Sequence, residues 1–159
     1  MGRTAIVALR VLLVVVLAGS LGGQLWFFPT LADGIAYAHP ELAWLQWPML
    51  GAVILAILVG QLALVAIWIL LSMVERGSVF SAEAFRWVNV IIAAGAIDAA
   101  LILAVNAFLT LQVRANPPVM VLFMLALTVA GAAFTCLMIV MKGLLRMALI
   151  LKTELSEVI

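Results

Sequence analysis

Five polar side chains interrupt the apolar stretches of this sequence, and their types could bind a proton or join helices by hydrogen bonds. They are Arg10, Gln24, Gln61, Asp98 and Asn106. Asp98 is the most demanding of them, because it falls near the middle of an apolar run. A charge at the centre of a bilayer costs at least about 2.5 to 3.5 kcal/mol on insertion scales. The Asp98 carboxyl must therefore be paired, hydrated or protonated.

The expected basic partner of Asp98 is Arg10 on a neighbouring helix. Arg86 shares the predicted helix of Asp98 but lies about 18 Å away along its axis, which is too far for contact. Neutral polar side chains are alternative partners and contribute about 0.6 to 2 kcal/mol each when they bond across helices. Three roles stay open for Asp98: hydrogen bonding between helices, a protonatable site for a transported proton or ligand, and contact with another subunit.

A second polar group lies in "MVERGSVFSAEAFRW", residues 73–87, where charges of both signs gather. Ser81 can cap the following helix, because a serine hydroxyl accepts from free amide groups of a first turn. Glu83 would lie in that turn, where a negative charge meets the positive end of the helix dipole. A capped turn with no further role is one interpretation. The other is a contact surface shared with the end of the chain, with these candidates: Arg76, Phe80, Ser81, Arg86, Glu154 and Glu157.

Residues suited to catalysis or metal binding are few. The chain has one cysteine, Cys136, and one histidine, His39, which excludes an intramolecular disulfide, a thiolate cluster and a multi-histidine metal site. It has no glycine-rich phosphate loop or nucleophile motif. We therefore expect no catalytic residues, no metal, no cofactor and no enzymatic activity.

The elements that must position these residues are membrane helices. The chain of 159 residues is 69% hydrophobic and 9% charged, with a mean hydropathy of +1.38, too little polar surface for a water-soluble globule. Apolar runs predict four helices at about 5–28, 47–73, 84–113 and 118–155. The predicted fold is an all-α, single-domain integral membrane bundle of four transmembrane helices.

The last predicted helix extends beyond the membrane. Pro117 and Pro118 suit its start, where a missing amide proton costs nothing. It then meets no strong breaker except Gly143, so that one helix of roughly 38 residues would run about 57 Å. Its apolar stripe beyond the membrane needs a cover, from the 73–87 connector, the lipid surface or a cytosolic partner.

The basic residues predict the orientation, because lysine and arginine in short loops stay on the cytoplasmic side. Arg114 is then the only basic residue on the external side. Both termini are expected to be cytoplasmic, together with the other seven basic residues: Arg3, Arg10, Arg76, Arg86, Lys142, Arg146 and Lys152. Residues 29–46 would form an external loop, with room for a short amphipathic helix from Pro40.

The segment "ERGSVFSAEAFRWVNVI" and the ending "GLLRMALILKTELSEVI" resemble the bacterial domain-of-unknown-function 2975 family. Gly77, Phe80, Ser81 and Arg86 carry the pattern Gly-x-x-Phe-Ser-x4-Arg. The resemblance covers nearly the whole chain and implies a small four-helix protein of the bacterial inner membrane, with no established activity. Some members are encoded beside small helix-turn-helix regulators, which implies a cytosolic regulator of that kind as a partner.

Two functions remain open. The first is a non-enzymatic sensor or regulatory partner that works through the cytoplasmic turn and the C-terminal helix. The second is a small transporter or ligand carrier that uses Asp98. The sparse polar groups within the membrane favour the first. Besides the lipid bilayer, we expect a homo-oligomer or a larger membrane complex as partner, and no direct binding of nucleic acid.

Overall fold

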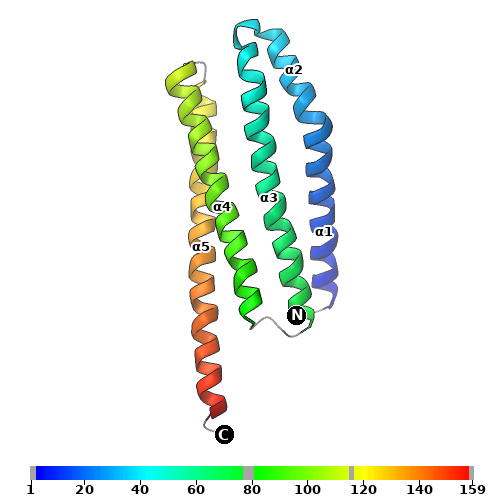
Figure 1. The fold of residues 1–159 in the computed structure, drawn as a ribbon, viewed down its shortest axis with the longest axis vertical. Helices are drawn as coiled ribbons and strands as arrows, with labels where there is room; N and C mark the ends of the chain where they lie inside the picture. Colours follow the sequence, from blue (N-terminus) through cyan, green and yellow to red (C-terminus); the bar gives the residue numbers. More distant parts are fainter. Residues whose placement is uncertain (1–2, 77–80, 115–116, 158–159) are drawn as a thin grey trace.

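The protein folds into long, nearly parallel and antiparallel helices (Figure 1). Its structure is a computed structural model that describes residues 3–76, 81–114 and 117–157. Within these ranges four helical segments are long and apolar enough to cross a membrane: Thr4–Ala38, Pro40–Glu75, Glu83–Val113 and Pro118–Ile150. The predicted all-α fold with four transmembrane helices is therefore confirmed.

The first span is longer than the sequence predicted, because the helix does not stop near Phe28. Helix α1 (Arg3–Gly22) continues through a π-helical turn, η1 (Gly23–Phe27), into α2 (Phe28–Ala38). Pro29 is compatible with this path, since it directly follows the π-helical turn, and local π adjustments re-satisfy the backbone groups that a proline leaves free in a membrane helix. The helix ends at His39, which leaves the helical region at φ −130° and ψ 76° because Pro40 follows it.

The expected external loop at residues 29–46 is therefore mostly helix. The short amphipathic helix expected from Pro40 is instead a 3-10 helix, η2 (Pro40–Leu45), that leads directly into α3 (Gln46–Glu75). A single residue, His39, separates the first span from η2. The first two spans thus form a tight helical hairpin (Figure 1).

Helix α4 (Ala82–Phe108) begins as the sequence predicted. Ser81 has an extended backbone, and its hydroxyl accepts a hydrogen bond from the Ala84 amide at 3.3 Å. Glu83 lies in the first turn. The helix continues through a second π-helical turn, η3 (Leu109–Val113), and ends at Arg114, whose φ of 54° lies in the left-handed region.

Helix α5 (Pro118–Glu157) is one continuous helix of 40 residues, as predicted. At 1.5 Å per residue it is about 60 Å long. Figure 1 shows its C-terminal part reaching well past the ends of α1, α3 and α4. We call this end of the molecule, where α1 begins and α5 ends, the termini end; the η2 end lies opposite.

Each long helix packs mainly on its neighbour in the order α1, α3, α4 and α5. Helices α4 and α5 approach closely at small residues. A methyl group added to Gly95 would lie 2.8 Å from Thr135 Oγ1, and one added to Gly131 would lie 3.3 Å from the Ala99 side chain. Small residues at such contacts let the backbones of membrane helices come together.

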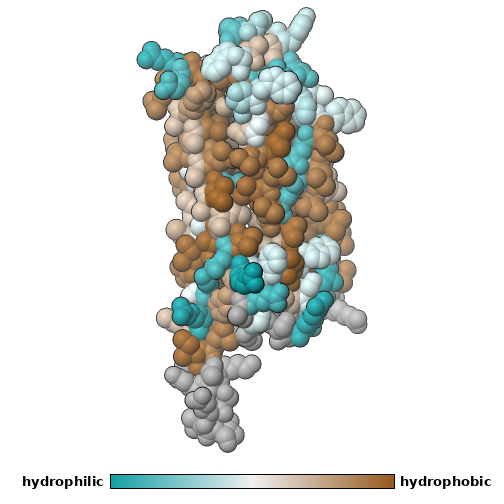
Figure 2. Space-filling view, viewed as in Figure 1, coloured by the Kyte–Doolittle hydropathy of each residue, from teal (hydrophilic) through white to brown (hydrophobic). Residues whose placement is uncertain are grey.

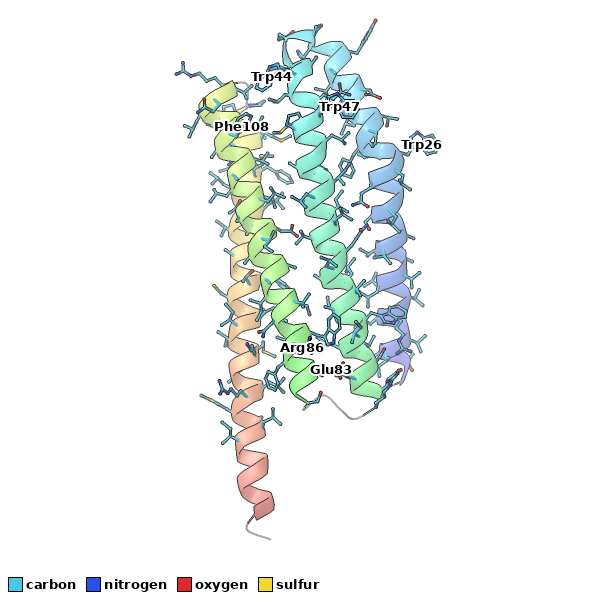
Figure 3. All side chains as sticks on the ribbon, in the orientation of Figure 1. Trp26, Trp44, Trp47, Glu83, Arg86 and Phe108 are labelled. Carbon is cyan, nitrogen blue, oxygen red and sulfur yellow. The ribbon has the colours of Figure 1, made fainter. Side chains whose placement is uncertain are left out.

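The surface has the distribution expected of a membrane protein. Figure 2 shows apolar residues over the middle of the visible face and polar residues gathered toward both ends. Trp44 and Trp47 lie at the η2 end and Glu83 and Arg86 at the termini end (Figure 3). Tryptophan is enriched where membrane meets water, so the two tryptophans indicate the level of that interface.

Candidate functional site

Two of the five intramembrane candidates, Gln24 and Gln61, bond to each other between the first span and α3. Gln61 on α3 donates to Ser20 Oγ at 2.9 Å and to Gln24 Oε1 at 3.1 Å, both on the first span. Gln24 is buried and donates to the carbonyl oxygen of Ile54 at 3.3 Å. These side chains satisfy one another and join α1 and η1 to α3, which is the usual role of amides between membrane helices.

Asp98 lies on the other side of α3, beside Gly60. A methyl group added to Gly60 would be 3.8 Å from Asp98 Oδ2, so the absence of a side chain there leaves room for the carboxyl group. Within the described residues, Asp98 Oδ1 is shielded from solvent and accepts no hydrogen bond. The structure therefore places Asp98 between α3 and α4, beside the residue that precedes Gln61 in the sequence.

Arg10 does not pair with Asp98, contrary to the expected pairing. Its guanidinium donates to Glu75 Oε2 at 2.6 Å and to Ser72 Oγ at 3.3 Å, and it lies 5.5 Å from the centre of the Trp68 ring. Arg10 is close to the start of α1 and Glu75 is at the end of α3, so an antiparallel hairpin brings them to the same level at the termini end.

Asn106 joins α4 to α5 near the η2 end. Its side chain is 4% exposed, and Nδ2 donates to the carbonyl oxygen of Val121 at 3.5 Å. The Thr110 hydroxyl donates to Asn106 Oδ1 at 3.5 Å. Both distances are at the long limit for a hydrogen bond, so these two bonds are weak.

At the termini end, α4 and α5 form a basic and apolar cleft. It has a volume of about 350 Å³ and is lined by Phe85, Lys142, Arg146, Leu149 and Ile150. Lys142 Nζ donates to Asn89 Oδ1 at 2.5 Å, which fixes this ammonium group against α4. The cleft is suited to a ligand or segment that combines negative charge with apolar groups.

The remaining candidates at this end are only partly covered by the structure. Arg76 caps the end of α3, and Arg86 is exposed on α4. The contact predicted between Phe80 and the stripe at Leu151 and Leu155, and the pairing of Arg76 or Arg86 with Glu154 or Glu157, fall outside the described residues and side chains.

Two features of the structure were missed by sequence reasoning. One is the ion pair between Arg10 and Glu75, which the opposite charges at neighbouring ends of an antiparallel hairpin could have indicated. The other is a larger, partly open apolar cavity at the η2 end, lined by residues from both halves of the chain. No sequence pattern marks it, because its walls come from helices far apart in the chain.

The described part of the chain has no group of three or more histidine, cysteine, aspartate or glutamate side chains placed to hold a metal ion. Cys136 is exposed on α5. The polar chemistry of the described residues includes interhelical hydrogen bonds, the Arg10–Glu75 pair, the Asp98 carboxyl and the basic cleft.

Four spans capable of crossing a membrane, joined by short connectors, define a multi-pass helical membrane protein. The family model described as "Protein of unknown function (DUF2975)" matches residues 30–159, and the chain belongs to that family. Neither the search of curated proteins nor that of solved structures found a match to the chain.

Proposed function

We propose that this protein is a non-enzymatic interaction protein of the bacterial inner membrane that binds a cytosolic partner at its termini end. In this proposal both termini are cytoplasmic, as the distribution of lysine and arginine favours. The binding surface consists of the projecting part of α5 and the cleft that α5 forms with the start of α4.

The length of α5 is the observation that carries the proposal. The helix has no charged residue from Pro118 to Met141, a length of about 36 Å that suffices to cross the hydrocarbon. Lys142 then marks the membrane surface, and the rest of the helix to Glu157 extends roughly 24 Å further. A helix of this length is not needed to span the bilayer, which favours a role for its end in the cytosol.

The surface of α5 near the cleft suits a protein partner. Leu144, Met147 and Ile150 are 56%, 65% and 53% exposed, so apolar side chains remain uncovered beside Lys142 and Arg146. A partner with an amphipathic helix that presents apolar and acidic side chains fits this combination. The family's association with helix-turn-helix regulators suggests a small protein of that class.

The proposal can be tested by photocrosslinking in intact bacteria. A photoreactive phenylalanine derivative at Met147, on the projecting helix, is expected to capture a defined cytosolic protein. The same derivative at Val129 is a matched control, because the two native side chains are similarly exposed, at 65% and 66%, while Val129 lies within the apolar part of the helix. The adduct should be absent at position 129.

A charge reversal makes this test specific. Arg146→Glu should abolish the adduct at position 147, because it places a negative charge in the basic cleft. Arg114→Glu reverses an exposed cation at the η2 end and should leave the adduct intact. Equal adducts at positions 129 and 147, or an adduct that survives Arg146→Glu, would contradict the proposed surface.

A second candidate function is transport or binding of a small ligand through Asp98. One observation favours it: a shielded carboxylate oxygen that accepts no hydrogen bond within the described residues and could take up a proton. The test is uptake of protons or cations into vesicles that contain the purified protein. If the Asp98 carboxyl carries the proton or cation, Asp98→Asn should abolish this uptake.

A further inference from the structure

We propose that the apolar cavity at the η2 end binds the acyl chain of a phospholipid whose headgroup carries an amine. The cavity lies at the opposite end of the molecule from the cytosolic surface proposed above and is independent of it. Its walls come from α2, η2 and the start of α3 on one side and from η3 and the start of α5 on the other.

The cavity has the size and lining of a small-molecule site. Its volume is about 760 Å³, within the range of roughly 300 to 1,000 Å³ that is usual for such sites. The lining is mainly aliphatic and includes three methionines, Met49, Met120 and Met124, whose flexible side chains adapt to a chain-like ligand. Polar groups are confined to His39, Glu41 and Gln46.

These polar groups lie at the level of a lipid headgroup. His39 and Glu41 belong to the connection between the first two spans, at the tip of the hairpin (Figure 1). Trp44 and Trp47 lie at the same end (Figure 3) and are 61% and 73% exposed, as expected of side chains in the membrane interface. Val53 and Met124 are further along α3 and α5, toward the middle of the membrane. The cavity therefore runs from headgroup level into the hydrocarbon, as an acyl chain does.

The charges at the rim favour an amine over an anionic headgroup. Glu41 lines the cavity and is held 3.2 Å from His39 Nδ1, and Asp33 accepts from the cavity residue Gln46 at 2.5 Å. No lysine or arginine lines the cavity within the described residues. A lipid ammonium group can donate to the Glu41 carboxylate, while the carboxylate of a fatty acid would be repelled by it.

The test uses the purified full chain in vesicles of phosphatidylcholine that contain a trace of photoactivatable lipid. The probes are phosphatidylethanolamine, phosphatidylcholine and phosphatidylglycerol that carry the same diazirine-labelled acyl chain. Mass spectrometry locates the labelled residues. We expect labelling at Met49, Met120 and Met124, with about a fivefold preference for phosphatidylethanolamine over the other two lipids, the effect of one net hydrogen bond of about 1 kcal/mol.

Two kinds of variant separate a bound lipid from the general lipid surroundings. Ala36→Phe places a large side chain in the cavity and should abolish labelling at Met120, whereas Ala133→Phe, at an exposed position of α5 outside the cavity, should not. Glu41→Gln leaves the apolar walls intact and should reduce the headgroup preference to about onefold. It serves as the independent arm if Ala36→Phe does not fold.

Three outcomes would overturn the proposal. Labelling of Met120 that persists at the same level in a folded Ala36→Phe variant would mean that lipids merely surround the protein. Equal labelling by all three lipids in the native protein would contradict the amine headgroup. Lipid adducts elsewhere on the protein but none at Met49, Met120 and Met124 would show that something other than a lipid fills the cavity.

Discussion

Gly95 sets how closely α4 and α5 approach, because any side chain at this position would meet Thr135. The threonine hydroxyl cannot simply turn away without loss, since it donates to the carbonyl oxygen of Gly131 at 2.8 Å. Replacement of Gly95 must therefore push the helices apart or break this hydrogen bond. The close packing of α4 on α5 therefore depends on Gly95 and Thr135.

Gly95→Leu should lower the free energy of unfolding by about 1 to 3 kcal/mol, the usual cost of overpacking a close contact. Gly143→Leu is the matched control, because a side chain added there has open space and leucine favours the helix over glycine. Thermal unfolding in detergent, followed by tryptophan fluorescence, measures both. Equal stability of the two variants would contradict a close contact at Gly95.

Asp98→Asn should leave insertion and thermal stability nearly unchanged. The carboxyl group is not held by Arg10, and asparagine keeps its shape while removing the cost of a charge in the bilayer. Asp98→Lys, which adds a cation beside Gly60, should reduce the yield of inserted protein. Loss of insertion in Asp98→Asn would contradict this expectation and show that the Asp98 carboxylate has an essential ionic partner.

The sequence predicts Asp98 as an unusual intramembrane residue, but the expected pairing of Asp98 with Arg10 is wrong, because Arg10 bonds to Ser72 and Glu75. Hydropathy locates a carboxyl along the membrane normal, whereas the partner depends on which helices are neighbours and on their rotation. Gln24 and Gln61 were predicted only as polar candidates; their mutual hydrogen bond depends on the packing of α1 on α3, which one sequence does not specify.

At the scale of helices, Arg10 and Glu75 hold the base of the first hairpin together. The pair is partly exposed, with side-chain exposures of 31% and 37%, so its contribution should be about 1 kcal/mol or less. Contact of the guanidinium with the Trp68 ring adds a cation–π interaction.

The double variant Arg10→Glu with Glu75→Arg tests this pairing. Each single change places two like charges together and should lower the unfolding temperature, while the double change should recover part of the loss. The recovery should be incomplete, because a glutamate at position 10 cannot replace the arginine above Trp68. Additive losses in the double variant would show that the two side chains act independently.

Helix positions were easier to predict than helix ends. Long apolar runs indicated all four spans, and Ser81 indicated the start of α4, because a capping hydroxyl acts locally. The expected loop after Phe28 is wrong, because the helix continues to Ala38. Pro29 does not end the helix, because the π-helical turn directly before it accommodates the missing amide proton and keeps the helix continuous.

For the molecule as a whole, the proposed orientation makes the η2 end external and the termini end cytoplasmic. In a variant with Cys136→Ser, a cysteine at Tyr37 should react with a membrane-impermeant thiol reagent added to intact cells, because this side chain is 92% exposed at the η2 end. A cysteine at Glu83 should react only after the membrane is permeabilised. The reverse pattern would invert the topology and remove the basis of a cytosolic partner.

The pairing of Arg10 with Glu75 also bears on how the chain enters the membrane during synthesis. Arg10 emerges from the ribosome well before Glu75, since the whole first hairpin lies between them. The Arg10–Glu75 pair can therefore form only after the second span has been inserted in the direction opposite to the first.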